Sequence, residues 1–226
     1  GCEYANDLSN GDFEVEVVGP GEHILPSLLP SVAADAVQRG LESLGVEFHL
    51  GPLLSSVNKT ESGVKVGLSN GKTIEADAVV SAIGLRPSLE LAVKAGLEVN
   101  QGIIVDRYMQ TSAENVYALG DCAEIDSKVL LYVLPLMTSA RTLAKTLTGN
   151  PTEVSYGPMP VMVKTPVVPV VAAPPAANAE GSWTIEAEGN NVKALFENAA
   201  GDLLGYALTG DKVTEKMALS KLLPPL

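Results

Sequence analysis

The chain has 226 residues, of which 46% are hydrophobic and 4% aromatic, enough for one large or two smaller hydrophobic cores. Fifteen basic residues against 27 acidic ones give a net charge of −12, which opposes binding to nucleic-acid phosphates and to anionic lipid surfaces. The most apolar stretch, residues 158–177, contains Lys164 and several prolines, so no segment predicts a membrane span.

The chain starts at Gly1 rather than at a methionine, and no basic segment followed by an apolar one comes after it. We therefore expect a piece of a longer protein, without a signal peptide. Cys2 and Cys122 lie far apart and form no zinc or redox spacing, so we expect both to be reduced, structural residues of a cytoplasmic protein.

The first fifty residues alternate between helix and strand. The opening residues through Leu8 read as a helix closed by residues 9–11, and residues 13–18 then alternate like a strand. An amphipathic helix is predicted from Pro30 to Gly45, followed by a strand at residues 46–50. This is the order expected for part of a parallel α/β sheet.

The rhythm then changes to short strands. Residues 64–68 and 73–76 predict a hairpin, and Asn70-Gly71 between them favours a type I′ turn, in which both central residues have positive φ. The unbroken apolar run at residues 78–83 predicts a strand buried on both faces of a parallel sheet.

After that run the helix–strand alternation resumes. We expect a short helix at residues 89–95, a strand at 102–106, a second strand at 116–119 that stops at Gly120-Asp121, and a longer helix at 136–147. Asn150-Pro151 then breaks the chain.

The composition shifts after this break. The segment 158–175 is rich in Pro and Val and has no helical periodicity. Antiparallel strands are predicted at residues 183–188, 192–197 and 203–209, followed by a helix that Asp211 caps.

Gly120-Asp121 is the pair with the clearest chemical meaning. A glycine at the end of a strand lets a ligand approach the backbone, and the carboxylate beside it can accept hydrogen bonds from a polyol or a ribose. On spacing alone, a plain entry into a helix explains the pair better. The full string TSAENVYALGD, with Thr111 ten residues before Asp121, favours the binding interpretation.

That string resembles the second flavin-contacting signature of the flavoprotein pyridine-nucleotide reductases. The segment SAIGLRP at residues 81–87 looks like the crossover at which the chain of this family returns to the flavin domain, and Gly84 is its glycine. Gly1-Cys2-Glu3 looks like the end of the family's GxGxxG-x-E fingerprint. All three matches occur in the order that the family requires.

The resemblance implies a fold class, α/β, with part of a two-dinucleotide-binding, glutathione-reductase-like flavoprotein fold and a C-terminal α+β domain. Residues 1–83 would form part of an NAD-binding domain, residues 84–150 the C-terminal half of an FAD-binding domain, and residues 151–226 the α+β domain.

The segments LYVLPLM at 131–137 and YGPMPVMVKTP at 156–166 most resemble the branch of the family that reduces rubredoxin. The resemblance implies FAD and NAD as cofactors, and electron transfer from NADH to rubredoxin. It places Asp121 and Gly120 on the ribityl chain of FAD, the backbone of Val133 and the side chain of Lys164 at the flavin ring, and Gly1 and Glu3 where nicotinamide meets flavin. It implies no acid–base residue and no metal ligand.

Several alternatives stay open. Glu22 could hold the adenosine ribose of NADH or could simply be solvated. His23 and His49 read as surface or strand residues, and Arg141 could reach a phosphate or pair with an acid. The electron acceptor could be another carrier such as ferredoxin, or the nitrite reductase system. The chain could also be a non-catalytic fragment or an interaction module. The sheet edge that residues 1–83 would leave exposed favours self-association.

Overall fold

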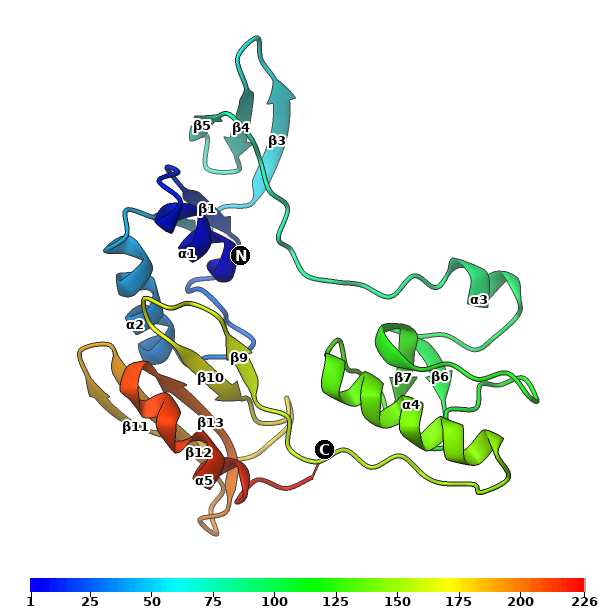
Figure 1. Ribbon diagram of the computed structural model, residues 1–226. Helices are drawn as coiled ribbons and strands as arrows, with labels where there is room; N and C mark the ends of the chain where they lie inside the picture. The colour runs from blue at the N-terminus through cyan, green and yellow to red at the C-terminus, as the bar shows by residue number, and fades with distance from the viewer. Residues whose placement is uncertain (226) are drawn as a thin grey trace. The chain divides into compact units, whose positions relative to one another are not determined.

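The structure is a computed structural model that describes residues 1–225. It divides into two compact units with separate hydrophobic cores. The first unit combines Gly1–Ala82 with Pro160–Pro224, and the second contains Ile83–Met159, drawn mainly in green in Figure 1. The chain therefore leaves the first unit after Ala82 and returns to it at Pro160.

The first unit opens with the predicted helix–strand alternation. Helix α1 (Cys2–Asn10) is followed by strand β1 (Glu16–Gly19), helix α2 (Ser31–Glu42) and strand β2 (Glu47–Leu50). The two strands pair in parallel. Among the residues that the structure describes, each has one edge without a strand partner. Self-association through such an edge stays a prediction.

A three-stranded antiparallel meander follows, with β3 (Leu54–Lys59), β4 (Val64–Leu68) and β5 (Thr73–Ala76). The predicted hairpin is confirmed, but the predicted type I′ turn is wrong. Gly71 has a φ of 86°, whereas Asn70 has no positive φ. The amide of Gly71 donates to the carbonyl of Leu68 at 3.0 Å, and the amide of Leu68 donates to the carbonyl of Lys72 at 2.9 Å. This makes a three-residue loop, in which only the last residue needs the left-handed conformation.

The predicted buried strand at residues 78–83 is also wrong. These residues form no strand, and Val79, Val80 and Ile83 have 44%, 59% and 94% of their surface exposed. A β-strand needs neighbouring backbone partners, and no described strand pairs with this segment. An apolar sequence alone therefore did not produce a strand here.

The C-terminal part of the first unit is a five-stranded antiparallel sheet. Its strands, in spatial order, are β11 (Ser182–Glu188), β12 (Asn191–Glu197), β13 (Leu203–Thr209), β10 (Val170–Ala173) and β9 (Val161–Val163). The first three were predicted. Strand β10 shows no alternation of apolar and polar residues, because Val170 and Ala172 pack in the core with α2 while Val171 and Ala173 pack in the core on the other face.

The chain ends in a 3-10 helix, η2 (Gly210–Glu215), and a short α-helix, α5 (Lys216–Ser220). These cover the sheet face that lies opposite α2, and Leu219 is buried in that core (Figure 1). The prediction that Asp211 caps the helix is wrong. Thr209 occupies the cap position, and the amide of Asp211 donates to Asn191 Oδ1 at 2.8 Å.

The described residues of the second unit form one small sheet and two α-helices. Strand β6 (Ile103–Val105) pairs in parallel with β7 (Ala123–Ile125), and β7 pairs antiparallel with β8 (Lys128–Val129). The helices are α3 (Glu90–Lys94) and α4 (Val133–Leu147), and α4 begins three residues before its predicted start. The proline at position 135 does not prevent this, because amides in the first helical turn lack an intrahelical acceptor.

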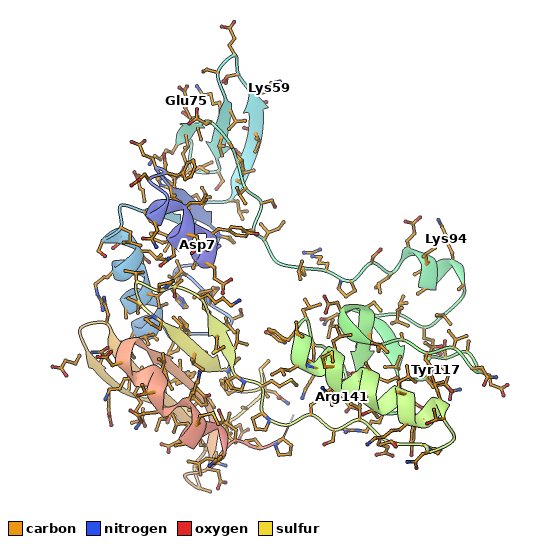
Figure 2. All side chains as sticks on the ribbon, viewed as in Figure 1. Asp7, Lys59, Glu75, Lys94, Tyr117 and Arg141 are labelled. Carbon is orange, nitrogen blue, oxygen red and sulfur yellow. The ribbon has the colours of Figure 1, made fainter. Side chains whose placement is uncertain are left out.

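The strand predicted at residues 116–119 is not formed. Only Tyr117 makes an isolated bridge, with Gln110, and the next element is a 3-10 turn, η1 (Gly120–Cys122). Figure 2 labels Tyr117 in this part of the second unit. Gly120 and Asp121 therefore precede the parallel strand β7 instead of ending a strand. The expectation that they lie at the carboxyl end of a strand is wrong.

Candidate cofactor site

The threonine of the TSAENVYALGD string shapes the loop before Gly120. The Thr111 hydroxyl donates to the carbonyl of Val116 at 3.0 Å and accepts from the amide of Ala113 at 3.2 Å. The amide of Thr111 also donates to Val116, at 2.9 Å. Thr111 is 9% exposed, so its part in the string is to fold the loop.

Gly120 brings the η1 turn close to helix α4. Its φ is 78°, and a Cβ built on it would lie 2.7 Å from Leu136 Cδ1. Both observations require a residue without a side chain. The carboxylate of Asp121, next in the chain, is exposed and has no hydrogen-bond or ion-pair partner among the described residues. It is free to accept hydrogen bonds from a ligand.

The start of α4 offers the complementary donors. Tyr132 is its N-cap residue, and Leu136 is the first helical residue whose amide donates, to the carbonyl of Tyr132 at 3.4 Å. The amides of Val133 and Leu134 have no acceptor within the part of the chain that the structure describes. Val133 is 72% exposed. Free amides and the positive end of a helix dipole favour a carbonyl or an anionic ligand group.

A small cavity lies between η1, β7 and α4. The hydroxyls of Ser139 and Tyr156 meet across 2.7 Å in its wall, and Ser139 is only 2% exposed. Arg141, which lies further along α4, is exposed and has no ion-pair partner among the described residues (Figure 2). The cavity is lined by Met109, Gly120, Ala123, Ile125, Lys128, Leu130, Pro135, Leu136, Ser139 and Tyr156.

In the first unit, two predicted site residues meet directly. Glu3 lies in the first turn of α1, and its Oε1 accepts a hydrogen bond from the main-chain amide of Lys164 at 2.7 Å. The Lys164 side chain is exposed, and no carboxylate of the described residues pairs with its ammonium. Gly1 is the N-cap residue of α1 and has no atoms near its Cα that would meet a side chain.

The predicted site residues therefore fall into two groups. Three of them, Gly1, Glu3 and Lys164, belong to the first unit, and the remaining four belong to the second unit. Gly84 has a φ of 92° and lies in an open segment, where a side chain would meet nothing within 4 Å. The second set consists of Gly84, Gly120, Asp121 and Val133.

One buried carboxylate was missed in the sequence. Glu124, in β7, is 4% exposed and accepts hydrogen bonds from Asn100 Nδ2 at 3.0 Å and from the amide of Gly102 at 2.9 Å. The hydrogen bond from Asn100 lowers the pKa of Glu124 below its usual 4.5. Nothing in the sequence signals this role, because its partners lie more than twenty residues away.

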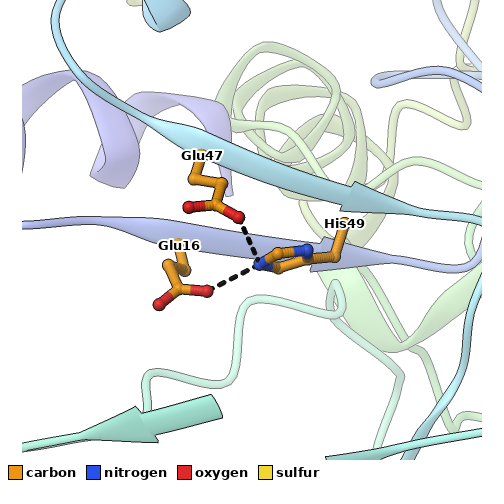
Figure 3. Close-up of side chains that lie close together, drawn as sticks. All are labelled: Glu16, Glu47 and His49. Atoms are coloured by element: carbon orange, nitrogen blue, oxygen red, sulfur yellow. Dashed lines mark hydrogen bonds and ion pairs between the residues drawn. The ribbon is translucent and has the colours of Figure 1, made fainter. Parts of the chain in front are cut away.

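A second missed cluster surrounds His49 (Figure 3). His49 Nε2 lies 2.6 Å from Glu16 Oε2 and 3.5 Å from Glu47 Oε1, and its side chain is 8% exposed. The parallel register pairs Glu16 with Glu47 and sets His49 two residues further along β2. Three such ligand atoms could hold a metal ion. However, Lys72 Nζ lies 3.2 Å from Glu47 Oε1 and 3.3 Å from His49 Nδ1, so an ammonium already offsets one of the two carboxylate charges.

Two protein-family profiles match the chain. The profile described as pyridine nucleotide-disulphide oxidoreductase matches residues 1–146. The chain belongs to this family. A second profile, described as rubredoxin binding C-terminal domain, matches residues 153–223.

Curated relatives match this chain along its whole length. A rubredoxin-NAD(+) reductase of Alcanivorax borkumensis is 59% identical over 100% of the chain and 59% of its own length. A rubredoxin-NAD(+) reductase of Acinetobacter baylyi is 40% identical over 100% of the chain and 58% of its own length. The chain therefore spans less than two thirds of the curated relatives that it matches.

A solved structure supports the fold. A ferredoxin reductase from Rhodopseudomonas palustris superposes with a TM-score of 0.83 at 24% identity, covering 94% of this chain and 55% of that one. The fold class predicted from the sequence is thus confirmed for this family member. Among the described residues, no helix is both long and apolar enough to cross a membrane.

Proposed function

We propose that the protein to which this chain belongs is an FAD-dependent oxidoreductase that passes electrons from NADH to rubredoxin. The observation that carries the proposal is the 59% identity, over the whole chain, to a protein named rubredoxin-NAD(+) reductase. The match of residues 153–223 to a rubredoxin-binding domain supports the same acceptor. Bound flavin would supply the conversion between hydride transfer and single-electron transfer.

The second unit supplies contacts that suit FAD. Asp121 has a free carboxylate for the ribityl hydroxyls, and Gly120 lets the turn that carries Asp121 lie against Leu136 of α4. Val133 presents a free amide at the start of α4, where a carbonyl edge of the flavin would find a donor and a favourable dipole. Gly84 would mark the passage into the flavin domain. These residues would bind and orient the cofactor without exchanging protons with it.

The first unit would contribute from the nicotinamide side. Gly1 and Glu3 would lie where nicotinamide meets flavin, and the exposed ammonium of Lys164 would stabilise negative charge on the reduced ring. Exposed Glu22, in the turn after β1, would accept hydrogen bonds from the adenosine ribose, which favours NADH over NADPH. The domains would be a partial NAD-binding domain at 1–83, the C-terminal half of an FAD-binding domain at 84–150 and a C-terminal domain at 151–226, in a cytoplasmic protein.

Docking of rubredoxin would be largely apolar. The chain carries a net charge of −12, which gives an acidic partner no strong attraction. The Pro- and Val-rich segment includes Met162, which is 56% exposed on the edge strand β9. Affinity for rubredoxin should change less than about tenfold between low and high salt, and a larger fall would contradict apolar docking.

The function is tested with the intact gene product. It should retain yellow flavin through gel filtration and reduce rubredoxin with NADH faster than with NADPH, and faster than it reduces ferredoxin. Asp121→Ala should weaken flavin retention by about tenfold or more, because a charged hydrogen-bond acceptor is lost. The matched variant Glu114→Ala, which removes an exposed acid of the same loop, should keep its flavin. A colourless protein, or equal reduction of both carriers, would contradict the proposal.

The 226-residue chain by itself should hold FAD weakly. It spans 59% of the length of the first relative, so contacts from the remaining length would be missing. A chain that stays yellow through gel filtration would contradict this expectation.

A further inference from the structure

Helix α1 holds the segment after strand β9 through two side chains on one face. Glu3 Oε1 accepts from the amide of Lys164 at 2.7 Å, and Asn6 Oδ1 accepts from the amide of Val167 at 3.3 Å. Glu3 and Asn6 are three residues apart in a helix, so their side chains lie on neighbouring turns of the same face. Both bonds join parts of the chain that are 161 residues apart.

Residues 165–168, which follow Lys164, form a tight turn whose first and last residues are buried. Thr165 is 1% exposed, and its hydroxyl donates to the carbonyl of Val168 at 2.7 Å, while the amide of Val168 donates back to Thr165 at 3.0 Å. Val168 is 2% exposed and packs against Gly40 of α2. The main chain at Lys164 is therefore held on one side by this turn and on the other by Glu3.

The side chain of Lys164 is anchored only through its backbone. No carboxylate of the described residues lies within 4.0 Å of its ammonium, so no ion pair sets its position. The bond from its amide to Glu3 is charge-assisted, and such bonds are stronger than those between neutral groups. The main chain from which the ammonium extends is thus held by the carboxylate of a residue in α1.

We propose that Glu3 is the positioning residue for Lys164. By holding the main chain of Lys164, Glu3 sets the place from which the ammonium reaches a cofactor. This inference rests on the proposed function, in which that ammonium stabilises the reduced flavin. A residue in the first turn of α1, which is proposed to lie at the nicotinamide side, would then also affect the reduction potential of the flavin.

The test uses the intact flavoprotein and two readouts. In Glu3→Ala, hydrogen exchange at the Lys164 amide should accelerate about tenfold or more, since its acceptor is gone. The flavin midpoint potential should become more negative, because the ammonium is no longer held near the ring. Glu3→Gln, which keeps an acceptor oxygen, should restore most of both properties. Asp7→Ala removes an exposed acid of the same helix (Figure 2) and should change neither.

A second pair of variants shows whether Glu3 acts through Lys164. In a Lys164→Met background, Glu3→Ala should cause no further shift of the potential. A full shift in that background, or unchanged exchange and potential in Glu3→Ala, would overturn the inference. If the unmodified protein holds no flavin, the proposed function fails instead, and amide exchange at Lys164 still tests the bond to Glu3.

Discussion

The Cα of Gly120 lies so close to helix α4 that a side-chain carbon there would be 2.7 Å from Leu136 Cδ1. This contact joins the turn that carries Asp121 to the helix whose start carries Val133. The absence of a side chain at Gly120 thus sets how closely Asp121 and the start of α4, the two predicted flavin contacts in the second unit, approach each other.

Gly120→Ala should therefore destabilise the second unit by about 2–5 kcal/mol. The positive φ of 78° costs an alanine about 1–2 kcal/mol, and overpacking against Leu136 costs about 1–3 kcal/mol. Urea unfolding would measure the loss. Gly157→Ala is the matched control, because a side chain there would meet nothing within 4 Å. Equal stability of the two variants would show that the close approach does not matter.

Gly40 gives a second test of close packing, between α2 and the turn after β9. Gly40→Ala should gain about 1 kcal/mol of helix propensity but lose about 1–3 kcal/mol, because its Cβ would clash with Val168 Cγ2. Combining it with Val168→Ala should recover about 1 kcal/mol or more relative to the sum of the single variants. Additive effects in this double-mutant cycle would contradict the contact.

Glu124 predicts a specific response to acid. Its folded-state pKa lies below its usual 4.5, so the ionised carboxylate stabilises the fold. That stabilisation is fully present above pH 4.5 and is lost as the pH falls through the lowered pKa. Glu124→Gln should cost about 1–3 kcal/mol at neutral pH, since one amide donor would face the amide of Gly102. It should also flatten the acid limb of stability measured by urea unfolding. If the stability of Glu124→Gln falls with acid as steeply as that of the unmodified protein, groups other than Glu124 cause the acid sensitivity.

Ile83 and Ile74 form a contrasting pair. In the 226-residue chain, Ile83→Asp should change the free energy of unfolding by less than about 0.5 kcal/mol, because Ile83 is 94% exposed. Ile74→Asp should cost several times more, because Ile74 is 6% exposed in the core of the meander. Circular dichroism during urea unfolding compares them. A large loss for Ile83→Asp would mean that this side chain is covered in solution.

The sequence was most informative where local patterns decide the structure. The apolar spacing of Ala33, Val37 and Leu41 predicted α2, and alternation predicted β11 to β13. It failed where the outcome depends on neighbours. Residues 78–83 are as apolar as a buried strand but pair with no described strand. β10, which is buried on both faces, was missed because it lies in the Pro- and Val-rich segment and has no alternation.

The candidate site divides in the same way. The motif string identified Asp121 and Gly120, whose φ and packing the structure now explains. The contact of Glu3 with Lys164 could not be predicted, because nothing in either local sequence specifies a partner 161 residues away. His49 shows the same limit, since Glu16 reaches it only through the register of β1 and β2.

The interruption of the first unit between Ala82 and Pro160 has a consequence for synthesis of the protein. Residues Ala33, Val37 and Leu41 of α2 are covered by strands that begin at Val170. At about 5–20 residues per second, a ribosome needs on the order of ten seconds to translate the chain from Leu41 to Val170. Residues Ile83–Met159 of the second unit are synthesised within that interval. A nascent chain thus exposes the apolar stripe of α2 while the inserted unit folds, and this is the period in which chaperones would bind it.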